Sequence, residues 1–119
     1  MAAHNELGRI GEELAVEYLE QNGYKILDTN WTYQKAEIDI IATKENILAI
    51  VEVKTRSRLD FGSPQDFVDS KKIQLLVKAV NAYINYREID FEIRFDIIGI
   101  HKNKESFVIE HLIDAFYHF

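Results

Sequence analysis

The chain has 119 residues, 47% of them hydrophobic, which is enough for a single domain over residues 1–119 with one core. It contains no cysteine, which excludes disulfides and thiolate metal sites, and no apolar run reaches the roughly 18 residues of a membrane span. Its net charge of −6 disfavours broad nonspecific nucleic-acid binding but permits a local basic patch, and its polar, acidic N-terminus is unlike a secretory signal, so we expect a cytoplasmic protein with no membrane partner.

The first half of the chain predicts one helix and three strands. The helix runs from Asn5, a suitable N-cap, to Asn22, and Gly23 ends it in the C′ position. Its apolar side chains recur at helical spacing, at Leu7, Ile10, Leu14 and Tyr18. Gly8 and Gly11 lie inside this helix, where each costs up to ~1 kcal/mol relative to alanine, so we expect another element to approach that surface closely. Three strands follow, at residues 24–33, 37–43 and 47–55.

The second half predicts a helix and two more strands. Residues 63–66 resemble a capped helix start. A longer helix begins at Asp69 or Ser70 and ends near Tyr86. Its apolar stripe consists of Ile73, Leu76, Val77, Val80 and Ile84. Strands at 93–101 and 107–111 and an apolar C-terminal tail at 112–119 complete an order of αβββαββ, which indicates an α/β (α+β) fold around one sheet.

The strand pair EIDIIATKENILAIVEVKTR, which begins at Glu37, carries charges that a core hairpin normally lacks. A two-residue turn, Glu45-Asn46, fits it, because asparagine tolerates the positive φ that such turns require. The resulting register places Asp39 opposite Glu52 and Glu37 opposite Lys54, and alternation then puts these four charges on one face. The other face is predicted to be core, formed by Ile38, Ile40, Val51 and Val53.

Two carboxylates that face each other across a ladder repel, and partial burial raises the cost. A cation resolves the conflict: either Lys54 in an ion-pair cluster, or a divalent metal on Asp39 and Glu52, since carboxylate oxygens suit Mg²⁺ or Mn²⁺. Beside a metal, Lys54 could orient or help deprotonate a water and stabilise developing negative charge. A polar patch at a solvated end of the sheet is the alternative, and the spacing alone leaves both open.

Asp39 followed by Glu52-Val53-Lys54 resembles the PD-(D/E)xK signature of restriction-endonuclease-like nucleases, although Ile38 stands in place of the proline. The match extends over residues 7–100, through GRIGEELAVEYLEQNGYKIL, NW, EIDIIA, VEVKTR, FGSP and RFDIIGI. Several blocks in this order resemble the small bacterial YraN-type family, which is similar in fold to archaeal Holliday-junction resolvases. The resemblance implies a three-layer domain with a central mixed sheet flanked by helices.

The resemblance also implies roles for individual residues. Asp39 and Glu52 would bind Mg²⁺ or Mn²⁺, with the Val53 carbonyl as a third ligand, and Lys54 would be the catalytic lysine. Glu12 matches the helix-borne glutamate that completes the acidic cluster in the resolvase-like branch. It lies on the flank of the apolar stripe, and a solvated helix charge is the alternative.

Further polar and aromatic residues are weaker candidates. A local phosphate-binding patch is expected from basic side chains, with ordinary surface charge as the alternative. Its members are Arg9, Arg56, Arg58, Lys71 and Lys72, and Gln65 is a further residue that could approach the substrate. Trp31 and Tyr33 alternate on the first strand and are expected to pack on the sheet rather than stack on a base. Arg94 and Asp96 are expected to be structural.

The leading hypothesis is a metal-dependent nuclease that hydrolyses phosphodiester bonds in branched or otherwise structured DNA, rather than RNA. One alternative is a noncatalytic nucleic-acid-binding module of the same fold, because the acidic net charge fits weak substrate binding. Another is a protein-interaction or assembly domain whose apolar C-terminus forms the contact. A junction resolvase would need a two-fold homodimer to cut both strands symmetrically, and no residue in the sequence demonstrates one.

Overall fold

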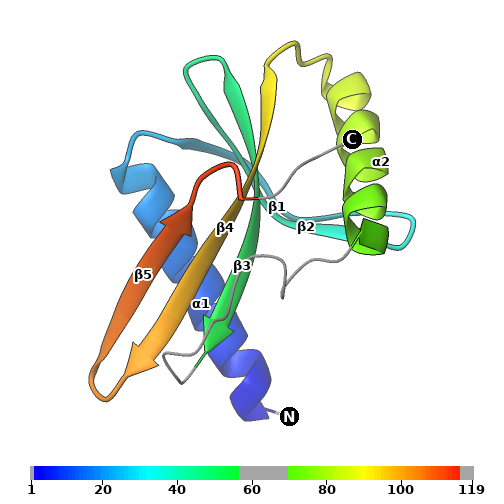
Figure 1. Ribbon diagram of the computed structural model, residues 1–119. Helices are drawn as coiled ribbons and strands as arrows, with labels where there is room; N and C mark the ends of the chain where they lie inside the picture. The colour runs from blue at the N-terminus through cyan, green and yellow to red at the C-terminus, as the bar shows by residue number, and fades with distance from the viewer. Residues whose placement is uncertain (1, 57–69, 116–119) are drawn as a thin grey trace.

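In the computed structural model, which describes residues 2–56 and 70–115, the elements follow the predicted order αβββαββ (Figure 1). The N-terminal helix α1 (Ala2–Gln21) is followed by three strands, β1 (Lys25–Tyr33), β2 (Ala36–Lys44) and β3 (Ile47–Arg56). Helix α2 (Ser70–Arg87) then precedes β4 (Glu92–Asn103) and β5 (Ser106–Leu112). The helices and strands predicted within the described residues are confirmed, with ends that shift by a few residues.

The strands form one mixed sheet in the order β1-β2-β3-β4-β5. Neighbouring strands are antiparallel except β3 and β4, which are parallel from Ile47 opposite Glu92 to Arg56 opposite His101. A parallel pair requires a crossover connection, and α2 lies on that connection. The middle of β3 and of β4 is buried on both faces, which explains apolar runs in these strands that do not alternate with polar residues.

The two helices cover opposite faces of the sheet (Figure 1). Under α1, a core cluster contains Ala15, Leu19, Tyr24, Ile40, Ala42, Ala49, Val51, Ile98 and Ile100. Under α2, a second cluster contains Ala36, Ile38, Ile41, Leu48, Ile50, Leu76, Ala79, Val80, Tyr83, Phe95 and Ile97. The predicted three-layer arrangement, with a central mixed sheet between helices, is therefore confirmed.

Local details at the element ends confirm some predictions and correct others. Helix α1 begins at Ala2, so Asn5 lies inside the helix and is not its N-cap. Gly23 has a φ of 91°, a conformation that glycine adopts without strain, and the predicted C′ glycine is confirmed. The β2–β3 turn lies where it was predicted, but its left-handed residue is Glu45, with a φ of 58°, rather than Asn46.

One of the two helix glycines marks a close approach between layers. A Cβ atom added at Gly11 would overlap the Thr55 hydroxyl and lie 3.0 Å from the Thr55 Cβ, so only glycine fits there. At Gly8 an added Cβ would meet nothing within 4 Å. The expected close contact is thus confirmed at Gly11, where α1 crosses β3, and not at Gly8.

The predicted apolar tail at 112–119 begins inside the sheet. Leu112 ends β5 opposite Ile97, and the Ala115 amide donates a 2.7 Å hydrogen bond to the Phe95 carbonyl. Residues 116–119 and the helix start predicted at 63–66 lie outside the described residues. Among the helices that the structure describes, none is long and apolar enough to cross a membrane.

Candidate functional site

Strands β2 and β3 separate at Asp39. The predicted register is confirmed over the inner pairs of the hairpin, as far as Ile40 opposite Val51. The ladder ends there, so the predicted pairing of Asp39 with Glu52 is wrong. Instead, the Asp39 carboxyl group accepts a 2.8 Å hydrogen bond from the Val53 amide, which replaces a bond that a backbone carbonyl of β2 would otherwise accept. A side chain inserted into the ladder in this way holds the two strands apart.

At Asp39 the side chains of β2 also depart from strict alternation between the two faces of the sheet. Ile38 packs under α2, so its predicted place on the same face as the other three residues is wrong. Ile40, Val51 and Val53 share the face under α1, as predicted. On the neighbouring strand, Asn30 has a left-handed φ of 51° and lies between Thr29 and Trp31, which pair with Ile40 and Ile38. Such a residue breaks strict alternation, because it turns the strand between one side chain and the next.

Asp39, which is half-buried, and Glu52, which is 7% exposed, form an acid pair. Burial, followed by the negative charge of Glu52 and a hydrogen bond between the two side chains, outweighs the Val53 amide and raises the pKa of Asp39 from 3.8 to about 8. A raised pKa favours the protonated form of Asp39, and a proton held between the two carboxyl groups relieves the repulsion that the sequence pattern implied.

Glu12 faces this acid pair from α1. It is half-buried and hydrogen-bonded to the Asn30 side chain. Burial raises the pKa of Glu12, and the charges of Glu37 and Glu52 add to the rise despite the bond from Asn30. Glu12 lines a cleft of about 130 Å³ on one side and another of about 320 Å³ on the other. A carboxyl group in this setting is not an ordinary solvated helix charge.

Lys54 lies two residues beyond Glu52 and is half-buried. It lines the cleft of about 130 Å³ together with Leu7, Gly8, Glu12, Val53 and Thr55. The predicted pairing of Lys54 with Glu37 does not form, because the β2–β3 ladder ends at Ile40 opposite Val51. An ammonium group and the Glu12 carboxyl group therefore border the same cleft, which has room for a few water molecules.

Lys72 reaches the acid pair from the other layer. It lies in the first turn of α2, and its ammonium group forms an ion pair with the Glu52 carboxylate. The Glu52 side chain is 8% exposed and that of Lys72 is 39% exposed, so the pair is partly shielded from water. The sequence suggested a phosphate contact for Lys72, and the structure shows its ammonium group in an ion pair with Glu52, a candidate metal ligand.

The other basic candidates are dispersed. Arg9 is hydrogen-bonded to Glu6 and Glu13 on the exposed surface of α1, so its charge is already neutralised locally. Arg56 and Lys71 are exposed at the end of β3 and the start of α2. The remaining candidates, Arg58 and Gln65, lie outside the described residues.

The acid pair fits a hard divalent cation that needs few protein ligands. Over residues 2–56 and 70–115, no group of three or more His, Asp or Glu side chains is arranged to hold a metal ion. Asp39 and Glu52 nevertheless present two adjacent carboxyl groups whose like charges a cation would neutralise. Mg²⁺ is commonly held by one or two carboxylates, with waters and substrate phosphates as its other ligands, and this donor set meets that requirement.

Two aspects of the site were missed by sequence reasoning. Asn30 was not a candidate, yet it bonds Glu12 and sits opposite Asp39. Its signal was an asparagine inside a strand, where that residue is depleted unless it adopts a left-handed conformation. The pairing of Lys72 with Glu52 has no local signal. Trp31, as expected, is a packing residue, since its ring lies 5.0 Å edge-on from Tyr83.

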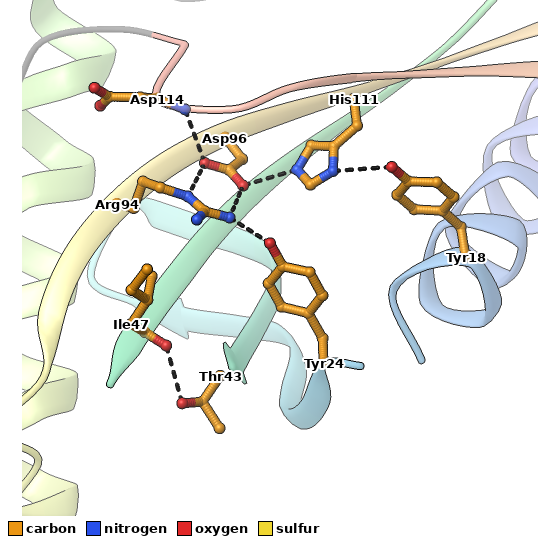
Figure 2. Close-up of polar contacts among 8 residues, drawn as sticks. All are labelled: Tyr18, Tyr24, Thr43, Ile47, Arg94, Asp96, His111 and Asp114. Carbon is orange, nitrogen blue, oxygen red and sulfur yellow. Dashed lines mark hydrogen bonds and ion pairs between the residues drawn. The ribbon is translucent and has the colours of Figure 1, made fainter. Parts of the chain in front are cut away.

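A second polar cluster lies between α1 and the strands β4 and β5, as Figure 2 shows. Asp96 is completely buried and accepts hydrogen bonds of 2.9 and 2.8 Å from Arg94, while His111 contacts it at 2.8 Å and the Asp114 amide donates to it at 3.1 Å. Although burial acts in the opposite direction, the bonds from His111, Arg94 and Asp114 lower the pKa of Asp96. Tyr18 completes the chain of contacts through His111. Because its polar groups are mutually satisfied, this cluster is structural.

Comparison with known proteins gives consistent matches over nearly the whole chain. Residues 11–100 match the sequence profile described as uncharacterised protein family UPF0102. A UPF0102 protein of Flavobacterium johnsoniae is 72% identical over the full length of both chains, and one of Flavobacterium psychrophilum is 68% identical, again over both full lengths. A UPF0102 protein of Bacteroides thetaiotaomicron is 50% identical over 98% of this chain and 97% of its own.

Proposed function

This chain belongs to the uncharacterised protein family UPF0102, and we propose that it is a metal-dependent nuclease that hydrolyses phosphodiester bonds in structured DNA. The observation that carries the proposal is the buried Asp39–Glu52 pair, held on rigid strands at the point where β2 and β3 separate. Such a pair costs stability, since it buries two carboxyl groups side by side. Binding of a divalent cation would explain why the protein has this destabilising pair.

Each residue of the site has a distinct part in the proposed reaction. Asp39 and Glu52 would hold Mg²⁺ or Mn²⁺, with the Val53 carbonyl as a third ligand, and Asp39 would lose its proton on binding. When bound, the cation supplies Lewis-acid polarisation of the phosphate and acidifies water. Lys54 orients the attacking water in the cleft and stabilises the negative charge that develops on the phosphate. Glu12, with its raised pKa, is suited to accept a proton from that water.

The choice of substrate rests on the resemblance to archaeal Holliday-junction resolvases. Resolvases of this kind act on branched DNA, and symmetrical cleavage of a junction requires a two-fold dimer. We therefore propose that the substrate is branched DNA and that a homodimer is the active form.

A cleavage assay tests the proposal. Purified protein is incubated with single-stranded, duplex, flapped and four-way-junction DNA, and with RNA, in Mg²⁺, Mn²⁺ or EDTA. We expect cleavage of branched DNA that requires the metal and that falls by about 10²-fold or more in Lys54→Ala, since the loss of a group that stabilises transition-state charge has an effect of that order.

Lys78→Ala is the matched control, because Lys78 is an exposed lysine in the middle of α2 that lines a different hollow, beside Tyr33 and Gln34. Its cleavage rate should equal that of the wild type. Cleavage that persists in Lys54→Ala, or that continues in EDTA, would contradict the proposal, because the activity would then arise elsewhere or from a contaminating enzyme.

A noncatalytic nucleic-acid-binding module is a second candidate. The observation that favours it is that, in the part of the chain that the structure describes, the acid pair is not joined by a third ligand side chain. A binding module would bind branched DNA equally in the wild type and in Lys54→Ala and would cleave none of the substrates. The same assay, run beside a gel-shift measurement, therefore separates the two candidates.

A further inference from the structure

The ion pair between Lys72 and Glu52 connects helix α2 to the acid pair. Lys72 lies in the first turn of α2, where the positive end of the helix dipole disfavours a cation. Its location is therefore explained by its partner, since Glu52 is a buried carboxylate that needs a compensating positive charge.

A divalent cation and the Lys72 ammonium group would compete for the same carboxylate. Both bind the oxygens of Glu52, and two cations at contact distance repel strongly in a partly buried setting. The Lys72 side chain is long and 39% exposed, so it can turn away from Glu52 without a backbone movement. Displaced from Glu52, the ammonium group would remain at a helix N-terminus beside the metal, a location that suits an anionic phosphate oxygen.

We infer that Lys72 is the resident counterion of Glu52, that a divalent cation displaces it, and that the displaced ammonium group then binds the substrate phosphate. This inference rests on the proposed nuclease function and deepens it, because it assigns Lys72 a positioning role that couples metal loading to substrate binding. In the metal-free protein Lys72 supplies the positive charge that pairs with the buried Glu52 carboxylate. In the metal-loaded protein it contributes one of the contacts that hold DNA.

Calorimetric titration of the full chain with Mn²⁺ tests the first half of the inference. Removing the competing charge in Lys72→Gln should tighten Mn²⁺ binding by about three- to tenfold, because a partly shielded ion pair is worth roughly that factor in affinity. Lys71→Gln is the matched control, since it removes the same charge from the neighbouring exposed position and should leave the affinity within about twofold of wild type. Lys72→Arg retains the pairing charge and should also behave as wild type.

The sign of the effect separates this role from a structural one. If Lys72 merely supports the fold, its removal loosens the site and weakens Mn²⁺ binding. A thermal melt guards against a variant that folds poorly, because ligand binding stabilises the folded state in proportion to its affinity. Saturating Mn²⁺ should therefore raise the melting temperature of Lys72→Gln by more than it raises that of the wild type.

Binding of a four-way junction at saturating Mn²⁺ tests the second half, with Glu12→Gln in each protein to prevent turnover. Lys72→Gln should bind the junction about five- to tenfold more weakly than its parent, despite binding Mn²⁺ more tightly. Equal Mn²⁺ affinity in wild type and Lys72→Gln would overturn the inference and leave the nuclease proposal standing. A wild-type protein that binds no Mn²⁺ would overturn both, and tighter Mn²⁺ binding with unchanged junction affinity would overturn the coupling.

Discussion

At Asp39, the proposed metal-binding function and the stability of the fold make opposite demands on one carboxyl group. Its pKa is raised to about 8, above the 3.8 of a solvated aspartate, so the folded state holds the proton more tightly than the unfolded chain does. The stabilisation from that proton is complete below pH 4. It declines as pH rises between 4 and 8, because the unfolded chain loses the proton first, and it is absent above pH 8.

Asp39→Asn should remove this pH dependence. Asparagine can accept the Val53 amide bond and donate to Glu52 as the protonated acid does. The variant should therefore become more stable than wild type by about 1–3 kcal/mol at pH 8, with a difference that shrinks toward pH 5. Urea unfolding at pH 5, 6, 7, 8 and 9 measures it, and a difference that does not change with pH would contradict the raised pKa.

Asp96 should behave in the opposite way, because its carboxylate is fully paired. Asp96→Asn disrupts the bidentate, charge-assisted hydrogen bonds from Arg94 and leaves that guanidinium group partly buried without its charge partner. We therefore expect a loss of about 3 kcal/mol in the free energy of unfolding. Arg9→Ala, which removes an exposed arginine from its two glutamates, should leave the urea midpoint unchanged. Equal midpoints for Asp96→Asn and wild type would show that the buried cluster is not structural.

At the residue scale, the acid pair and its lysine were predictable because their spacing along two strands is a local property. Asp39, Glu52 and Lys54 were identified from strand alternation, a turn and the resemblance to a nuclease signature, although the metal that they would bind stays a prediction. The contact of Lys72 with Glu52 was not predicted, because the two residues lie 20 positions apart, across a crossover that brings α2 onto the sheet. Only the packed structure establishes such a contact.

At the scale of elements, the approach of α1 to β3 sets the geometry of the cleft. Gly11→Ala should push the helix away from Thr55 and destabilise the protein by about 2 kcal/mol, because an overpacked contact between layers has a cost of that order. It should also move Glu12, the next residue, relative to Lys54, so the cleavage rate should fall with the stability.

Gly8→Ala is the matched control on the same helix. An added methyl group there meets open space, so it should stabilise α1 by up to ~1 kcal/mol through helix propensity alone. Chemical denaturation compares the two variants. If both alanines stabilise the protein, the close contact at Gly11 is not a real constraint.

The element order was predictable from hydrophobic period, glycine positions and turn residues. The register of β2 against β3 was also predicted correctly for the pairs near the turn, since the turn fixes it. It failed beyond Ile40 because a side chain enters the ladder at Asp39 and Asn30 adopts a left-handed conformation on the next strand. Departures of this kind are local and have no periodic signature, and here they coincide with the candidate site.

For the whole molecule, the net charge of −6 limits how the proposed nuclease would hold DNA. Within the described residues, the cations on β3 and at the start of α2 are Lys54, Arg56, Lys71 and Lys72. Four cations neutralise few phosphates, so we expect a DNA substrate to be recognised over a short stretch of backbone.

The salt dependence of junction binding should reflect that small patch. The slope of log affinity against log salt should lie between about −2 and −4, since each neutralised phosphate contributes roughly −0.9. Fluorescence anisotropy in 50–300 mM salt, with Glu12→Gln to prevent turnover, measures the slope. A slope steeper than about −6 would require a basic surface much larger than the one described.

The three layers together assemble the site, since α1 provides Glu12, the sheet provides the acid pair, and α2 provides Lys72. We propose that the acid pair binds a divalent cation, and anomalous diffraction from crystals soaked in Mn²⁺ tests this. We expect a strong peak within coordination distance of Asp39 and Glu52 oxygens in the wild type, and no such peak in Asp39→Asn. A wild-type map without density there, at a Mn²⁺ concentration that fills other sites in the crystal, would contradict it.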